Sequence, residues 1–252
     1  MKLTLALVSS LSMALAAPST EVVSSLDKRQ QRSLCGLYDY WSGYGYEMLN
    51  NLWGKDTASS GSQCTYLNSA SDSGIAWSST WNWQGAPDNV KSYVYVGRQV
   101  TKGRKISQIN SMPTSISWRY DTENIRANVA YDVFTAADPN HANSGGDYEL
   151  MIWLARLGNV YPIGQKMTTV NIGGKNWDLW EGYNGKMKVF SFLAQGTTYS
   201  WSGDAKHFFN WLQQNKGYPA SQQNVIVYQV GTEAFTGGPA TFTVSQFSAS
   251  IN

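Results

Sequence analysis

Short segments in which polar and apolar residues alternate, separated by Gly, Ser and Asn, recur along most of this 252-residue chain. Side chains on a β-strand point to opposite faces in turn, so these segments predict half-buried strands. The segment 75–83 is an example, because Ile75, Trp77, Trp81 and Trp83 fall on one face. Many short strands at regular spacing predict an all-β sandwich or barrel rather than alternating βαβ units.

One stretch departs from this pattern and predicts a helix over residues 202–214, because its apolar residues follow a helical spacing. Ser202 or Asp204 can cap its start, and Gly217 can end it. The apolar residues of this stripe are Ala205, Phe208, Phe209 and Leu212.

Two glycine pairs, at 173–174 and 237–238, predict turns between strands. Residues 160–163 predict one more short strand. No internal repeat or linker interrupts these elements, which favours one domain over residues 30–252.

Composition and motif content narrow the possible functions. The net charge is only +2 and no basic stripe is present, which argues against a nucleic-acid partner. The sequence has no G-x-S-x-G or H-E-x-x-H motif, and its two histidines lie far apart, so neither a serine-hydrolase triad nor a metal site is expected. Eleven tryptophans suit a large sandwich core or a groove that binds carbohydrate, since an indole presents a broad apolar face.

The N-terminal residues have the features of a targeting segment. Lys2, a short apolar run and the small residues at 14–16 predict a signal peptide over residues 1–17, and so a secreted protein. The run is too short for a membrane span. The dibasic pair at 28–29 predicts a propeptide over residues 18–29, and neither segment enters the fold argument.

Cys35 and Cys64 are the two cysteines of the chain. In a secreted chain an even number of cysteines favours a disulfide. Such a bridge would tie the N-terminal strand to the rest of the domain and contribute about 3–4 kcal/mol in the chain-entropy model.

The segment 145–154 predicts a strand with one unusual face. Its core face is apolar and consists of Tyr148, Leu150, Ile152 and Leu154. The other face combines acids with large side chains, Asp147, Glu149, Met151 and Trp153. A carboxylate beside an indole suits a cleft that cleaves sugars, because the ring can support a pyranose and the carboxylate can act as nucleophile or base. The alternative is an edge-strand acid with an incidental tryptophan.

Cleavage of a glycosidic bond requires a second carboxyl group. Glu233 is one candidate, since it shares a strand face with Gln229 and Gly231 and precedes a glycine-rich segment. Asp132 is another, on a strand whose opposite face carries Tyr131. The alternatives are a strand-end acid that faces water for Glu233 and a hydrogen-bonded structural acid for Asp132.

Several segments together resemble the secreted endo-β-1,4-glucanases of glycoside hydrolase family 12. This resemblance implies a β-jelly-roll sandwich of two antiparallel sheets with one α-helix on the convex side. It also implies an open groove for a β-glucan chain on the concave sheet. The segments that carry it are 51–54, 61–64, 131–137, 147–153, 231–237 and 240–244.

The resemblance implies a role for particular residues. Glu149 matches the nucleophile and Glu233 the acid/base, while Asp132 matches the acid that hydrogen-bonds to the nucleophile. Ala234 departs from the family, which usually has Pro after the catalytic Glu. The expected groove residues are Trp53, Met151 and Trp153, and the expected N-terminal disulfide joins Cys35 and Cys64.

From this resemblance we expect a secreted, monomeric enzyme that cleaves internal β-1,4-glucosidic bonds of cellulose-type and mixed-linkage β-glucans with retention. Retention requires the two carboxyls about 5–5.5 Å apart. The negative charge of Glu149 should raise the pKa of Glu233. We expect no cofactor, no metal and no membrane partner. The alternatives are a xyloglucan-specific endoglucanase, a non-catalytic glycan-binding jelly roll and a related β-sandwich xylanase.

Overall fold

The computed structural model describes residues 32–252. The predicted signal peptide (1–17) and propeptide (18–29) lie outside the described residues. Among the described residues, no helix is both long and apolar enough to cross a membrane.

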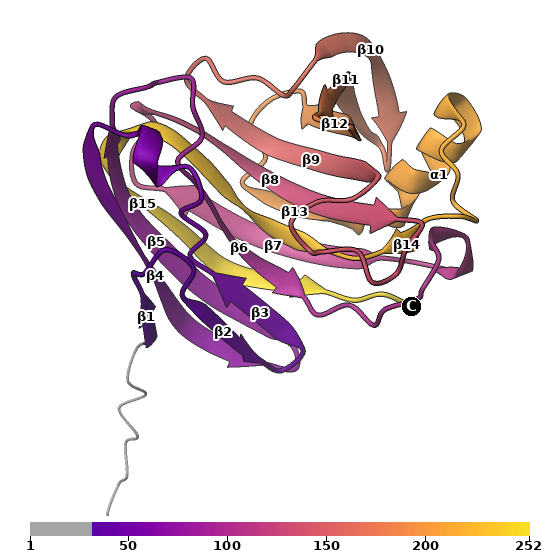
Figure 1. The fold of residues 1–252 in the computed structure, drawn as a ribbon, viewed down its shortest axis with the longest axis horizontal. Helices are drawn as coiled ribbons and strands as arrows, with labels where there is room; N and C mark the ends of the chain where they lie inside the picture. Colours follow the sequence, from indigo (N-terminus) through magenta and orange to yellow (C-terminus); the bar gives the residue numbers. More distant parts are fainter. Residues whose placement is uncertain (1–31) are drawn as a thin grey trace, which may run out of the picture. The chain divides into compact units, whose positions relative to one another are not determined.

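The described strands form two layers that share one long strand, β15 (Gln229–Ala249), which is yellow in Figure 1. In the first layer neighbouring strands pair antiparallel, except that β9 and β12 run parallel. Its strands, in spatial order, are β2 (Tyr40–Gly43), β3 (Tyr46–Leu49), β6 (Ser92–Arg98), the first part of β15, β8 (Ile125–Ala136), β9 (Tyr148–Leu157), β12 (Met187–Ala194), β11 (Lys175–Asn184) and β10 (Gln165–Ile172).

The second layer is antiparallel and packs against the core-facing side of the first. Two short 3-10 helices, η1 (Lys55–Thr57) and η2 (Ile106–Gln108), and the two-residue strand β14 (Asn224–Val225), which pairs with β8, complete the connections. The strands of the second layer, in spatial order, are β1 (Arg32–Leu34), β4 (Ser60–Ser71), β5 (Gly74–Gln84), the last part of β15, β7 (Pro113–Tyr120) and β13 (Ser200–Asp204). This arrangement confirms the predicted jelly-roll sandwich.

β15 passes from one layer to the other at the predicted turn, 237–238. Before this point it pairs with β6 and β8, and after it with β5 and β7. Gly237 and Gly238 have φ of 116° and 94°, and a Cβ on Gly238 would lie 2.6 Å from the carbonyl oxygen of Trp81. The turn prediction was therefore wrong: the glycines let a single strand bend and continue.

The core between the layers follows the predicted alternation. Tyr131 of β8 and Ile152 of β9 are fully buried, and the ring of Tyr46 in β3 lies 5.9 Å from that of Phe247 in the opposite layer. Since alternate residues point away from this core, Asp132 of β8 is directed to the outer face of the first layer.

The helix α1 (Lys206–Lys216) covers the core beside β10 to β12 (Figure 1). It begins four residues later than predicted, because residues 202–204 belong to β13 and pair with β7. Gly217 ends the helix in the left-handed conformation, as predicted. Phe208 packs 5.0 Å from Phe192 on the core-facing side of β12, which places the helix on the predicted convex side.

Residues 160–163 form no strand, contrary to prediction. Val160 is buried beside Met151 and Trp153 in a cluster on the outer face of the first layer, so its apolar side chain serves packing and not strand pairing. A short apolar run therefore gave a false strand signal here.

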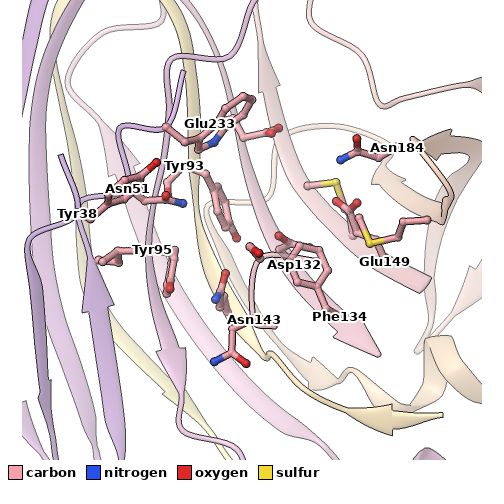
Figure 2. Close-up of a pocket in the computed structure, with 16 residues that line it drawn as sticks. Tyr38, Asn51, Tyr93, Tyr95, Asp132, Phe134, Asn143, Glu149, Asn184 and Glu233 are labelled. Atoms are coloured by element: carbon pink, nitrogen blue, oxygen red, sulfur yellow. The ribbon is translucent and has the colours of Figure 1, made fainter. Parts of the chain in front are cut away.

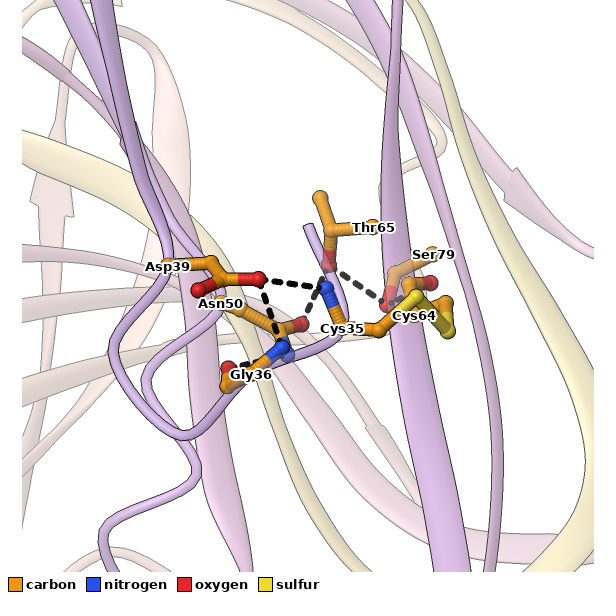
Figure 3. The surroundings of a disulfide bond; sticks show 7 residues. All are labelled: Cys35, Gly36, Asp39, Asn50, Cys64, Thr65 and Ser79. Atoms are coloured by element: carbon orange, nitrogen blue, oxygen red, sulfur yellow. Dashed lines mark hydrogen bonds between the residues drawn. A yellow bond between two sulfur atoms is a disulfide. The ribbon is translucent and has the colours of Figure 1, made fainter. Parts of the chain in front are cut away.

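The predicted disulfide is present and joins Cys35 to Cys64 across a sequence separation of 29 (Figure 3). The Asp39 carboxylate accepts hydrogen bonds from the backbone N–H groups of Cys35 (3.0 Å) and Gly36 (2.7 Å). On the other side of the bridge, the Thr65 hydroxyl lies 2.8 Å from the amide oxygen of Asn50. The N-terminal segment is thus fixed to β4 by a covalent bond and by hydrogen bonds.

Candidate active site

A hollow of about 620 Å³ opens on the outer face of the first layer (Figure 2). Side chains of β6, β8, β9 and β15 line it, and Asn51, Trp53, Asn143 and Ser144 contribute from connecting segments. The hollow thus lies on the sheet face that is directed away from the main core.

Three neighbouring strands each place one carboxyl group in this hollow: Glu233 on β15, Asp132 on β8 and Glu149 on β9. Asp132 pairs with Met151, so these two side chains lie next to each other on the outer face. Asp132 and Glu149 are buried, and Glu233 is partly exposed. The structure therefore brings together the three acids that the sequence selected.

Burial raises the pKa of all three acids, because it disfavours a charged carboxylate. The pKa of Glu233 rises to about 7. The pKa of Glu149 rises to about 8, with a further contribution from the charge of Glu233. The pKa of Asp132 lies well above its usual value, through burial and the charges of Glu149 and Glu233.

The charges of Glu149 and Glu233 act on Asp132, and that of Glu233 acts on Glu149, so protonation of one carboxyl affects the pKa of its neighbours. A raised pKa keeps a carboxyl protonated closer to neutral pH, which is what a general acid requires. The cause of the raised pKa of Glu233 differs from our expectation, since burial rather than the charge of Glu149 is the main contribution.

The expected hydrogen bond between Asp132 and Glu149 is not formed. Asp132 Oδ1 and Glu149 Oε2 are each buried without a hydrogen-bond partner among the described residues. Two ionised carboxylates can only accept hydrogen bonds, so this bond requires a proton on one of them.

Asn128 of β8 holds the carboxyl group of Glu233, and the sequence analysis missed it. Its amide Nδ2 donates to Glu233 Oε2, and its Oδ1 accepts from the Glu233 backbone N–H at 2.8 Å. The first of these bonds lowers the pKa of Glu233 against the effect of burial. Asn128 shares strand parity with Asp132, which was the available signal.

Tyr93 and Tyr95 of β6 form a wall of the hollow, with ring centroids 5.8 Å apart. The Tyr93 hydroxyl donates to the carbonyl oxygen of Ala130 at 3.1 Å. Burial and the neighbouring charge of Asp132 raise the pKa of Tyr93, so its hydroxyl stays neutral. The alternation within β6 could have revealed both tyrosines.

The three predicted groove residues differ in their placement. Trp53 is 54% exposed and lines the hollow, as does Met151. Trp153 is only 2% exposed and is not among the lining residues. It packs with Val160 and Phe235, and its indole N–H donates to Met151 Sδ at 3.3 Å. Trp153 therefore supports Met151 from below and presents no open face to the hollow.

Within residues 32–252, no three His, Cys, Asp or Glu side chains form a group that could hold a metal ion. The arrangement of the carboxyls instead suits proton transfer and nucleophilic attack.

The chain is similar to a known protein family and to solved structures. The family model described as "Glycosyl hydrolase family 12" matches residues 44–252. The catalytic domain of Humicola grisea Cel12A, solved with a soaked thio cellotetraose, is 66% identical and superposes with a TM-score of 0.87, covering 88% of this chain and 99% of that one.

Two similar fungal proteins differ in the specificity that their names give. Endoglucanase A of Aspergillus kawachii is 48% identical, over 88% of this chain and 93% of its own length. The xyloglucan-specific endo-beta-1,4-glucanase A of Emericella nidulans is 42% identical, over 94% of this chain and 99% of its own length.

Proposed function

The chain belongs to glycosyl hydrolase family 12 and is an endo-β-1,4-glucanase, and we propose that it works by double displacement with Glu149 as nucleophile and Glu233 as acid/base. The observation that supports this assignment is the presence of these two carboxyls in one hollow. The role of each follows the family resemblance, because the pKa of both groups is raised and the pKa order does not itself mark Glu149 as the nucleophile. A glycan-binding module would need the aromatic residues but no paired acids.

In the first step, a carboxylate oxygen of Glu149 attacks the anomeric carbon. The bond from that carbon to the leaving sugar oxygen breaks, and Glu233 transfers its proton to this oxygen. A covalent glycosyl-enzyme and a shortened glucan with a free hydroxyl are the products. Glu233 is left ionised.

In the second step, ionised Glu233 takes a proton from a water molecule, whose oxygen attacks the anomeric carbon. The bond to Glu149 breaks, Glu149 returns to its carboxylate form, and the sugar is released with its original configuration. Asp132 assists by holding a proton near Glu149, because its burial favours the neutral acid.

The substrate in this proposal is an unbranched β-1,4-glucan or mixed-linkage β-glucan. The exposed indole of Trp53 stacks on a sugar ring, and Met151 contacts the sugar nearest to the acids. Xyloglucan is the second candidate, since the Emericella nidulans relative carries that specificity in its name. Activity on xylan in the same assay would instead support the third candidate, a related β-sandwich xylanase.

The cellular setting in this proposal is extracellular. The signal peptide predicted from the sequence for residues 1–17 supports secretion, and a disulfide is typical of secreted proteins. We further propose that the enzyme acts as a monomer, with residues 30–252 as its catalytic domain.

The decisive experiment compares wild-type protein with Glu149→Gln on carboxymethyl cellulose, mixed-linkage β-glucan, xyloglucan and xylan. Reducing ends should appear from the first two substrates with wild type only, and product sizing should show internal cleavage. Proton NMR of early products should show the β-anomer, as retention requires. An α-anomer would exclude double displacement, and equal activity in Glu149→Gln would exclude Glu149.

A further inference from the structure

Lys91 is a buried lysine that forms no ion pair with a carboxylate among the described residues. Its side chain is fully buried, and its ammonium donates three hydrogen bonds to backbone carbonyls: Ala86 (2.7 Å), Asn89 (2.7 Å) and Phe235 (2.9 Å). An ammonium group has three donors, so all of them are used. The charge is thus stabilised by backbone dipoles alone.

Two of these carbonyls belong to the connection between β5 and β6. Ala86 has φ of 40°, a left-handed conformation that is strained for a residue with a side chain. Arg126 of β8 also holds this connection, through the carbonyl of Pro87 at 3.0 Å and the carboxylate of Asp88 at 2.6 Å. The connection is therefore fixed from two sides and can serve as a rigid support.

The third carbonyl belongs to Phe235, two residues after Glu233 on β15. The backbone N–H of Lys91 also donates to the carbonyl of Ala234 at 2.8 Å. Lys91 therefore holds two consecutive carbonyls that follow Glu233. The first of these carbonyls belongs to Ala234, which stands where the family usually has a proline.

Lys91 also contacts the segment that presents Trp53. Its carbonyl oxygen accepts the backbone N–H of Gly54 at 3.0 Å. A Cβ on Gly54 would lie 2.0 Å from the carbonyl oxygen of Val90, so the two segments pack with no room for a side chain. Lys91 thus connects the segment that carries Trp53 to the strand that carries Glu233.

We propose that Lys91 is a positioning residue for acid catalysis: its ammonium fixes the backbone after Glu233, so that the Glu233 carboxyl meets the leaving oxygen. This inference rests on the proposed function. Lys91 touches no reacting atom and acts only through the strand that carries Glu233.

The test compares two substrates that differ in their need for an acid. When a β-1,4-glucan is cleaved, the leaving group is a sugar hydroxyl, which requires a proton from the acid. The leaving group of a dinitrophenyl β-cellobioside is 2,4-dinitrophenolate, which departs without one. The parameter is kcat/KM, which covers substrate binding and formation of the glycosyl-enzyme but not its hydrolysis, because the leaving group departs irreversibly at initial rate. The variant is Lys91→Met, which keeps the length of the side chain and removes its three donors.

We expect Lys91→Met to lose about tenfold or more in kcat/KM on the glucan, a part of what a general acid contributes, and less than about threefold on the dinitrophenyl glycoside. The ratio of the two values does not depend on the folded fraction, so poor folding alone cannot produce the effect. Lys91→Gln, which retains two donors, should shift the ratio in the same direction by a smaller factor.

The matched control is Lys206→Met in α1. Lys206 is also buried, and its ammonium donates to Asn210 at 2.6 Å, far in the fold from the carboxyl cluster. This control should leave the ratio at the wild-type value. Glu233→Gln sets the largest ratio expected from loss of the acid.

Equal losses on both substrates in Lys91→Met, or no loss on either, would overturn the positioning role. If Glu233→Gln itself lost activity equally on both substrates, the proposed acid/base assignment would fail instead. An inactive wild-type protein would count against the proposed function as a whole. The three results are therefore distinguishable.

Discussion

Asn128 holds Glu233 at two points, because its amide nitrogen donates to the Glu233 carboxyl and its amide oxygen accepts the Glu233 backbone N–H at 2.8 Å. Both residues lie on the outer face of the first layer, on adjacent strands. Asn128 therefore holds the Glu233 carboxyl in place and also lowers its pKa against the larger effect of burial.

Replacing Asn128 with Ala should move the alkaline limb of the pH profile of kcat/KM to higher pH, by up to about one unit. The hydrogen bond from Asn128 lowers the pKa of Glu233, so its loss raises that pKa above its value of about 7. The protonated acid then persists to higher pH. The maximal kcat should fall about tenfold, because the carboxyl is no longer held in place.

The control for this variant is Asn171→Ala, at an exposed asparagine whose amide donates to Asn176 at 2.8 Å on β11. It should keep the wild-type profile. An alkaline limb in Asn128→Ala that stays in place or moves to lower pH would contradict the assigned role of the hydrogen bond.

The pH dependence of stability should also report the carboxyl cluster. Folding raises the pKa of Glu233 from 4.5 to about 7 and that of Glu149 from 4.5 to about 8. The folded state therefore binds more protons than the unfolded state across this window. The stabilisation is complete below about pH 4.5 and is lost as the pH rises to about 8, so the free energy of unfolding should fall over that range.

Glu149→Gln removes one of these groups and should flatten this dependence. At pH 8 the variant should be more stable than wild type by on the order of 1–3 kcal/mol, and at pH 4.5 the two should be similar. Urea unfolding at pH 4.5, 6 and 8 measures this difference. Glu123→Gln, at an exposed carboxyl, should keep the wild-type slope. Parallel slopes for wild type and Glu149→Gln would show that Glu149 does not titrate in this window.

The faces of the strands were predictable from the sequence, and this is why the acids were found. The two-residue period of a strand assigns Tyr131 and Asp132 to opposite faces without any knowledge of neighbouring strands. The same holds for Glu149 and Leu150. The resemblance to a known family then supplied the proposed roles of these acids. The predicted fold agreed with the observed one in its two sheet layers and in its helix.

Features that depend on distant partners were not predictable. The helix begins at Lys206 and not at Ser202, because β13 pairs with β7, whose paired residues lie 83 to 91 positions earlier. Trp153 and Trp53 have the same side chain but opposite exposure. Packing of Trp153 against Phe235 brings together parts of the chain that no local pattern connects.

Removing the disulfide by Cys35→Ser with Cys64→Ser should lower the free energy of unfolding by about 3–4 kcal/mol, since the bridge closes a loop with a sequence separation of 29. Urea unfolding measures this loss, and kcat should stay near wild type because the bridge lies outside the hollow. For comparison, Thr65→Val removes only the hydroxyl that bonds to Asn50 and should cost about 1–2 kcal/mol. If the variant with both Cys35→Ser and Cys64→Ser had wild-type stability, the stabilising role of the disulfide would be contradicted.

The two tryptophans should respond to replacement in opposite ways. Trp53→Ala should raise KM for the glucan about fivefold to tenfold, as expected when an exposed aromatic contact to a ligand is lost, with little change in stability. Trp153→Ala should instead lower the free energy of unfolding by about 3–5 kcal/mol, because it leaves a cavity beneath Met151. Substrate kinetics together with urea unfolding separate the two effects. A raised KM in Trp153→Ala at unchanged stability would return this residue to the groove, where the sequence had placed it.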